Sequence, residues 1–444
     1  MKKVFNILLA ALMIFPVAAS AQQNLRSGYF LDGYTYKYKM NPAMAPERGF
    51  FAMPVLGNMG IGMESNLGLS DFLYPTESGK LATFLSPNVS NEEFLKHVPE
   101  NHRMNMNYDL NILAFGFRTG KSYHTVDLST RIDGSANVPG SLYSFMKVGS
   151  ALGDYNWDIS NIGMKASARA QLAYGYSRSI NEALTIGARV KLLMGMFNLD
   201  VTMDKMQLEM SADRWAVEAH GDMILSDNIS EFSPSSFGFG IDLGATYDFL
   251  DYFTASLSVL DLGSVSWNNT TIASTPDTSW SFDGFDNVQM TSMGEQISEM
   301  ISDLTGAFAF EKKEVGVKKS AGLAATIHAG IEARMPFYER LSFGMLYTQK
   351  IDGVYSFSEG RLAASVAPTN WFSLTTNYAI SNLGHSWGGA VNLHLPGFGI
   401  FFGLDSLVPL MNVTPQFIPV NAVNTNMAFG INFSFGKYHG RFAK

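Results

Sequence analysis

The chain has 444 residues, a formal net charge of −8, 16% charged residues and no cysteine. Charged residues fall below the ~25% of an average soluble domain, whereas glycine (41 residues) and phenylalanine (33 residues) are abundant. The lack of cysteine excludes disulfides and thiolate chemistry. An acidic chain without a Lys/Arg cluster also argues against a nucleic-acid partner.

The first 21 residues have the pattern of a secretory signal peptide. Two lysines precede a largely apolar run over residues 4–17, and Ala19-Ser20-Ala21 is typical of a cleavage site. We therefore expect residues 1–21 to be removed during secretion. Downstream, no apolar run approaches the ~20 residues of a spanning helix, so a membrane crossing must use strands of ~9–11 residues.

Residues 22–49 are rich in aromatic side chains but have no membrane-spanning pattern. They lead directly into the first predicted strand. We therefore expect them to enter a barrel lumen as a plug, with Tyr34, Tyr36, Asn41 and Pro42 contacting the wall. The alternative is a periplasmic tail with one short edge strand, and the pattern leaves both interpretations open.

Alternation of apolar and polar residues predicts antiparallel strands along most of the chain. The clearest hairpin covers residues 164–196, with alanine, leucine, tyrosine and methionine on one face and serine, lysine and arginine on the other. A second hairpin covers residues 237–259. Beyond it Asp261 would fall on the apolar face, so we expect a bulge or the membrane rim there. Further strands are expected at residues 50–63, 104–112, 126–132, 325–335, 341–351, 354–367, 371–381, 386–395, 398–405 and 427–435.

The strand at residues 427–435 carries large apolar side chains on one face and small or polar ones on the other. It fits either a sandwich core or a barrel wall whose aromatic residues face lipid. Because the pattern recurs in about fourteen strands, we predict an all-β transmembrane antiparallel β-barrel over residues 50–435. A periplasmic tail is expected over residues 436–444.

The predicted strands are joined by short turns that mostly alternate with longer connections. In outer-membrane barrels the short turns are periplasmic and the long loops lie outside. We therefore expect a protein of the Gram-negative outer membrane, in contact with its lipid and inserted by its assembly machinery. The longer connections are expected at residues 64–103, 134–160, 204–235, 267–320 and 406–426.

Several short motifs carry a resemblance to a known family: residues 41–43, 174–178, 184–191, 240–247 and 259–263, with Trp267. With these motifs the chain resembles an uncharacterised outer-membrane family of Bacteroidota, a domain of unknown function. That family is similar to FadL-type long-chain fatty-acid transporters and to the PorV-type barrels of type IX secretion. The resemblance implies a fourteen-stranded barrel, an N-terminal plug and a hydrophobic ligand. Unlike FadL-type barrels, this chain continues beyond its last strand.

The polar faces of the strands carry charges of both signs. A selective pore would favour one sign, so we expect ion-pair networks that hold the plug or fill the lumen. The candidate lumen contacts are Arg169, Arg189, Asp242, Glu332 and Arg334. No spacing typical of a metal site or a catalytic triad is present, so we expect no metal, no cofactor and no enzyme activity.

Two capping boxes predict short helices in the long connections, one near residues 92–98 and one near residues 292–304. Their apolar faces either pack on the barrel rim or form a lid or groove for an apolar ligand. The candidate lining residues are Phe94, Leu95, Met293, Ile297, Met300, Ile301, Leu304, Phe308 and Phe310.

Two functions remain open from the sequence. The first is a FadL-like barrel that transports or binds a hydrophobic small molecule. The second is a non-transporting scaffold or secretion partner, similar to the PorV-type, whose loops bind another protein. An apolar pocket between loops and plug would favour the first, and a filled lumen with exposed apolar loop tips would favour the second.

Overall fold

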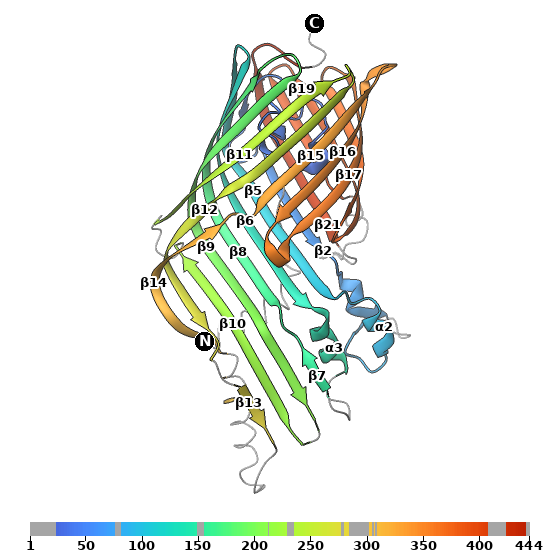
Figure 1. Ribbon diagram of the computed structural model, residues 1–444. Coiled ribbons are helices and arrows are strands. Elements are labelled where there is room, and N and C mark those ends of the chain that lie inside the picture. The colour runs from blue at the N-terminus through green and yellow to red at the C-terminus, as the bar shows by residue number, and fades with distance from the viewer. Residues whose placement is uncertain are drawn as a thin grey trace.

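The computed structural model of this protein is a closed all-β barrel (Figure 1). Fourteen strand positions surround the lumen in antiparallel order, as the sequence predicts. The helices within the described residues are all too short or too polar to span a bilayer. The structure describes residues 24–75, 81–148, 155–211, 213–228, 235–276, 279–283, 302–303, 306, 309–406 and 423–440.

The wall strands follow one another along the chain, and the last strand closes the ring. β21 pairs with β20 on one side and with β1 and β2 on the other. In order, the wall strands are β1 (Gly49–Ala52) and β2 (Met59–Ser65), β5 (Asn101–Thr119), β6 (Ser122–Pro139), β8 (Ile162–Ser179), β9 (Leu184–Met210), β11 (Ser236–Phe249), β12 (Phe253–Ser274), β15 (Ala325–Met335), β16 (Tyr338–Ile351), β17 (Phe357–Thr369), β18 (Phe372–Ser381), β19 (Gly384–Leu395), β20 (Phe398–Leu404) and β21 (Val423–Phe435).

The first wall position differs from the continuous strand predicted at residues 50–63. It is divided into β1 and β2, because residues 53–58 leave the regular ladder. Pro54 has no amide hydrogen to donate, and Val55 adopts a positive φ of 67°. The prediction of one unbroken strand is therefore wrong at this point.

The two faces of the wall differ as the alternation predicts. On β9, Val190 and Leu192 are 49% and 51% exposed on the outside, whereas Arg189 and Lys191 are buried in the lumen. On β11, Ile241 is exposed and Asp242 is fully buried. Because the exposed face is apolar and the enclosed face polar, the outside of the barrel suits lipid.

This assignment predicts unequal costs for charged substitutions on the two faces. Leu192→Arg places a charge on the lipid-facing side and should lower the free energy of unfolding by about 2–4 kcal/mol near the bilayer midplane. Ser167→Arg, on the lumen side of β8, should cost much less because water and counter-charges are available. Urea unfolding in lipid vesicles measures both values, and equal costs would contradict the face assignment.

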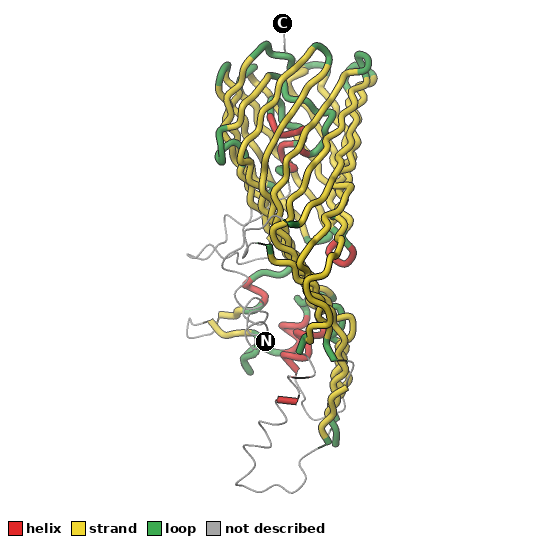
Figure 2. The backbone as a smooth tube through the Cα atoms, turned by 90° about the vertical axis from the view of Figure 1, so that its left-hand side faces the viewer, coloured by secondary structure: helices red, strands yellow, loops and turns green. Residues whose placement is uncertain are grey.

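The two ends of the barrel also differ. At the short-turn end, residues 120–121, 250–252 and 370–371 each join neighbouring strands directly. At the opposite, long-loop end, several strands continue beyond the barrel as a narrow sheet (Figure 2). The additional elements are η3 (Leu69–Asp71), β3 (Leu73–Pro75), β4 (Leu81–Thr83), α2 (Asn91–Leu95), α3 (Gly140–Val148), β7 (Tyr155–Asp158), β10 (Trp215–Asp227), β13 (Ser279–Phe282), β14 (Glu311–Gly322) and η4 (Gly353–Tyr355).

The predicted loops at residues 204–235 and 267–320 are wrong in part. β9 continues to Met210 and pairs with β10 over its extension, and β12 continues to Ser274 and pairs with β14. These strands project beyond the closed barrel (Figure 2), where a lipid-facing side is not required. The strict apolar–polar alternation is therefore not needed, and the sequence signal for a strand is weak.

The N-terminal segment, residues 24–48, lies inside the barrel, in the half nearer the short-turn end (Figure 1, dark blue). It contains two short 3₁₀ turns, η1 (Arg26–Gly28) and η2 (Thr35–Lys39). Its aromatic rings form the lumen core with wall residues; this core includes Tyr29, Phe30, Tyr34, Tyr36, Tyr38, Phe50 and Phe401. The segment thus replaces the lumen water with packed rings, and its role as a plug stays a prediction.

Candidate functional site

Arg26 of the N-terminal segment lies in a buried cluster of charges. Its Nη2 donates a hydrogen bond to Glu64 Oε1 (2.9 Å). Its Nε lies 3.0 Å from Glu359 Oε1 as an ion pair without hydrogen-bond geometry, and 3.8 Å from Asp405 Oδ2. Arg361 pairs with Glu359 and Asp405 at 2.9 and 3.6 Å. These five side chains, the Arg26 cluster, hold two cations and three carboxylates away from water.

Two further contacts fix the segment to the wall. Lys39 Nζ donates hydrogen bonds to Asp109 Oδ1 (2.8 Å) and Asn111 Oδ1 (2.6 Å) on β5. The Ser27 amide and hydroxyl each donate to Asp405 Oδ1 at 2.6 Å. Charged hydrogen bonds are about twice as strong as neutral ones, so these contacts anchor the segment on either side of its tyrosine-rich run.

Asn41 and Pro42 are seated in a notch formed by two wall glycines. Gly187 of β9 and Gly244 of β11 lie directly opposite each other in the sheet. A Cβ atom added at Gly187 would lie closer than 3.0 Å to the Pro42 backbone, and one at Gly244 would crowd Asn41 in the same way. Asn41 Nδ2 also donates to the carbonyls of Ala245 and Leu257, both at 3.3 Å. This glycine notch is therefore shaped to the segment.

A continuous chain of ion pairs crosses the lumen face of β6, β8, β9, β11 and β12. It runs from Asp127 through Arg189, Asp242, Lys191, Asp261, Arg131 and Asp133 to Arg169, with N–O distances of 2.6 to 3.2 Å. Cations and carboxylates alternate, so the chain is neutral. The expected bulge at Asp261 is confirmed by a φ of 59° and a register shift in the β11–β12 pairing.

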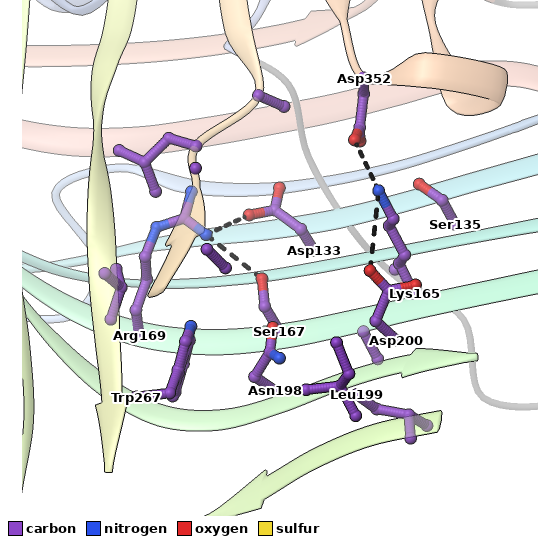
Figure 3. A pocket seen from close by; sticks show the side chains of 18 of the residues that line it. Asp133, Ser135, Lys165, Ser167, Arg169, Asn198, Leu199, Asp200, Trp267 and Asp352 are labelled. Carbon is purple, nitrogen blue, oxygen red and sulfur yellow. Dashed lines mark hydrogen bonds and ion pairs between the residues drawn. The ribbon is translucent and has the colours of Figure 1, made fainter. Parts of the chain in front are cut away.

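The Arg169 end of this chain opens into a cavity of about 320 Å³ on the long-loop side of the N-terminal segment, which we call the lumen cavity (Figure 3). Eight of its lining residues are charged: Arg131, Asp133, Lys165, Arg169, Asp200, Lys319, Lys350 and Asp352. An apolar wall completes it, with Leu199, Ile224, Val265, Trp267 and Leu323. The cavity can therefore hold a small molecule against both polar and apolar groups.

The predicted lid residues fall into two groups. Phe94, in α2, is fully buried and stacks on Phe84 with ring centroids 4.4 Å apart, and Leu95 packs beside it. Burial in the same cluster raises the pKa of the Tyr143 hydroxyl. Phe310 is half-buried just before β14. The others, Met293, Ile297, Met300, Ile301, Leu304 and Phe308, lie outside the described residues.

Phe94 and Leu95 thus lie in a closed aromatic cluster, and Phe310 lies outside it. Of the two predicted capping boxes, the one before residues 92–98 has its N-cap bond, because Ser90 accepts a hydrogen bond from the Glu93 amide. The box and most of the helix predicted near residues 292–304 lie outside the described residues. The arrangement agrees with packing at the long-loop end of the barrel. A role for these residues in ligand binding stays a prediction.

The predicted lumen contacts lie at different depths. Tyr34 and Tyr36 belong to the lumen core and pack against Phe401, with ring centroids 4.9 and 5.5 Å away. Glu332 is buried on the lumen side of β15. Arg334 is half-buried, and its amide donates to the Tyr252 carbonyl at the short-turn end. The lumen cavity therefore contains only Arg169 of the predicted set.

Sequence reasoning missed the residues that anchor the segment and close the cavity: Arg26, Lys39, Glu64, Glu359, Asp405 and Lys319. A signal was present for two of them, because Arg26 and Lys39 are among the few cations in a stretch rich in aromatic residues. Lys319 was hidden in a region expected to be a loop. The partners come from strands far apart in the chain, so spacing alone does not pair them.

A closed antiparallel barrel with an apolar outer face and a polar, filled lumen is an outer-membrane β-barrel. Residues 42–405 match the model of a family of unknown function, DUF5723, and the chain belongs to that family. None of the curated proteins matches the sequence.

Several solved barrels are similar to this chain over most of its length, at low identity. The Ralstonia pickettii toluene transporter TbuX has 10% identity and a TM-score of 0.43, covering 90% of this chain and 93% of its own. The P. putida toluene transporter TodX has 9% identity and a TM-score of 0.41, covering 95% and 96%. A Pseudomonas aeruginosa FadL homologue has 11% identity and a TM-score of 0.43, covering 95% and 99%. Structural similarity at this level does not indicate which ligand this protein binds.

Proposed function

We propose that this protein is a transport barrel that receives a small molecule in the lumen cavity, beneath which the N-terminal segment closes the path. The observation that supports it most is the order of the two along the lumen. The cavity lies on the long-loop side, and the aromatic core of the segment fills the part nearer the short-turn end. A ligand passing through must displace the segment.

The contacts of the segment suit a closure that can be released. It is held by the Arg26 cluster, by Lys39 and by the glycine notch rather than by strand pairing. A barrel of fourteen strands is too wide for its own wall side chains to fill, since about eight strands is the size that they can close. Closure therefore depends on the segment.

Removing the segment should open the barrel. We expect deletion of residues 24–40, with the signal peptide kept, to raise the permeability of cells to small hydrophilic dyes and antibiotics. The physical reason is that the aromatic core would lose most of its rings and water would enter. Dye uptake by intact cells measures the effect.

The control for this deletion is a barrel of normal abundance and protease resistance in the outer membrane. Unchanged uptake by such a correctly assembled barrel would rule out closure by the segment. Closure would then have to be assigned to the loops of the long-loop end.

A second candidate function is supported by the sheet that projects beyond the barrel. Trp215, at the start of β10, is 39% exposed there, next to an apolar cluster around Leu208 and Val217. Such a surface fits a protein-binding scaffold. A photo-reactive residue at position 215 that crosslinks one defined outer-membrane protein in cells, together with unchanged permeability after the deletion, would favour this function.

A further inference from the structure

The charges around the lumen cavity are not evenly balanced. Its lining has five cations and three carboxylates, in a protein whose net charge is −8. Most of these cations are neutralised: Lys165 lies 3.9 Å from Asp200 and 3.3 Å from Asp352. Lys350 also pairs with Asp352, at 3.5 Å. Arg131 and Arg169 pair with Asp261 and Asp133, at 3.1 and 2.8 Å. An excess of positive charge among the described residues therefore comes from the one lining cation that is left.

Lys319 is the lining cation without an acidic partner among the described residues. It lies on β14 directly opposite Trp267 of β12 and is exposed to solvent. A free ammonium group at the edge of the cavity can supply hydrogen bonds and a positive charge to a ligand.

Arg169 supplies a second, independent feature inside the cavity. The residue is 7% exposed, and its Nη1 contacts Asp133 (2.8 Å) and Ser167 (3.3 Å). Its buried Nε has no hydrogen-bond partner among the described residues. This Nε is closed off from solvent, so Arg169 acts on a ligand through the positive charge of its guanidinium group at the cavity lining.

From these observations we propose that the lumen cavity binds a compact anion, a small molecule with carboxylate or phosphate groups, between Lys319 and Arg169. The apolar wall formed by Trp267, Leu199 and Val265 contacts the carbon skeleton of the ligand. This inference rests on the proposed function and names the ligand class. It differs from the hydrophobic ligand that the sequence resemblance implies, because a purely apolar molecule would leave the Lys319 ammonium without an acidic partner among the described residues.

The test compares a charged probe with a neutral one of similar shape. Isothermal titration calorimetry of the purified full-length barrel in detergent is carried out with 1,3,5-benzenetricarboxylate and with 1,3,5-benzenetrimethanol. We expect the tricarboxylate to bind at least about tenfold more tightly, the change in affinity produced by one charge-assisted hydrogen bond. Its affinity should also fall as salt concentration rises.

Variants locate the binding in the cavity. Lys319→Gln should weaken tricarboxylate binding about tenfold. Arg169→Lys keeps the charge but loses the planar guanidinium group that suits carboxylate and phosphate, and should also weaken binding. The matched control is Lys318→Gln, which removes the same charge from the neighbouring residue of β14, outside the cavity lining, and should leave the affinity unchanged.

Equal affinity for the two probes, no binding of the tricarboxylate, or equal effects of Lys318→Gln and Lys319→Gln would overturn the anion assignment. Palmitate bound with an affinity that Lys319→Gln does not change would also overturn it, while leaving the proposed transport function in place. The transport proposal fails separately, if deletion of residues 24–40 leaves permeability unchanged.

Discussion

Arg26→Met should weaken the docking of the N-terminal segment by about 3–5 kcal/mol, the cost of removing one partner from a buried ion pair. In the variant, Glu64, Glu359 and Asp405 remain buried with Arg361 as their sole cation within the Arg26 cluster. The apolar methionine can fill the volume of the arginine but cannot compensate these charges. Hydrogen exchange of the amides of residues 26–31 measures the free energy of local opening.

The control for this prediction is Arg48→Met in the same segment. Arg48 donates to the Gly436 carbonyl at the surface (3.1 Å) and lies over the Tyr438 ring, so its loss should cost less than about 1 kcal/mol. Adding Glu64→Gln to Arg26→Met should recover part of the stability, because Glu64 pairs with Arg26 in the cluster and would otherwise stay buried as an uncompensated carboxylate. Protection of residues 26–31 that is equal in the wild type and Arg26→Met would contradict the anchoring role of the Arg26 cluster.

Gly187→Ala should open the barrel without removing any residue of the segment. The added methyl group would meet the backbone of Pro42 closer than 3.0 Å. Neither partner can move easily, because the wall strand is held by its ladder and Asn41 is hydrogen-bonded to two wall carbonyls. We expect the residues around Pro42 to leave the glycine notch. Conductance of single barrels in planar bilayers should then show open events that the wild type lacks.

The matched control is Gly240→Ala, on the lumen face of the neighbouring strand β11. Its Cβ would meet Leu323 and Lys191 side chains at 3.4 and 3.5 Å, which are ordinary contacts, and its conductance should match that of the wild type. Equal conductance of Gly187→Ala and the wild type would show that the notch does not control the path. An equal rise in both variants would instead indicate a general loosening of the wall.

The wall of the barrel could be predicted from the sequence, because a strand that crosses a membrane must alternate. One face meets lipid and the other meets the lumen, so the pattern over residues 184–196 or 237–247 specifies both strand and orientation. Beyond the closed barrel this alternation is no longer required, and the sequence no longer predicts the strands. The extension of β9 and the strands β10 and β14 meet solvent on the long-loop side, and they were expected as loops.

The candidate site could be predicted only as a set of residue types. The alternation placed Arg169, Arg189 and Asp242 on the lumen face, and the structure joins them in one chain of ion pairs. The sequence did not show that Phe94 and Leu95 would pack into a closed aromatic cluster. Helical spacing identifies an apolar face but not what covers that face.

The sequence by itself determined the class of fold, since apolar and polar positions repeat with a period of two residues and secondary structure depends on that local period. Only the tertiary structure decided how the lumen is filled. Arg26 pairs with Glu359 and Asp405, which lie more than 300 residues away in the chain. The glycine notch that holds Asn41 and Pro42 forms only because Gly187 lies beside Gly244. These contacts depend on ring closure, which brings distant strands around one segment, and no local pattern records which residues will then face each other.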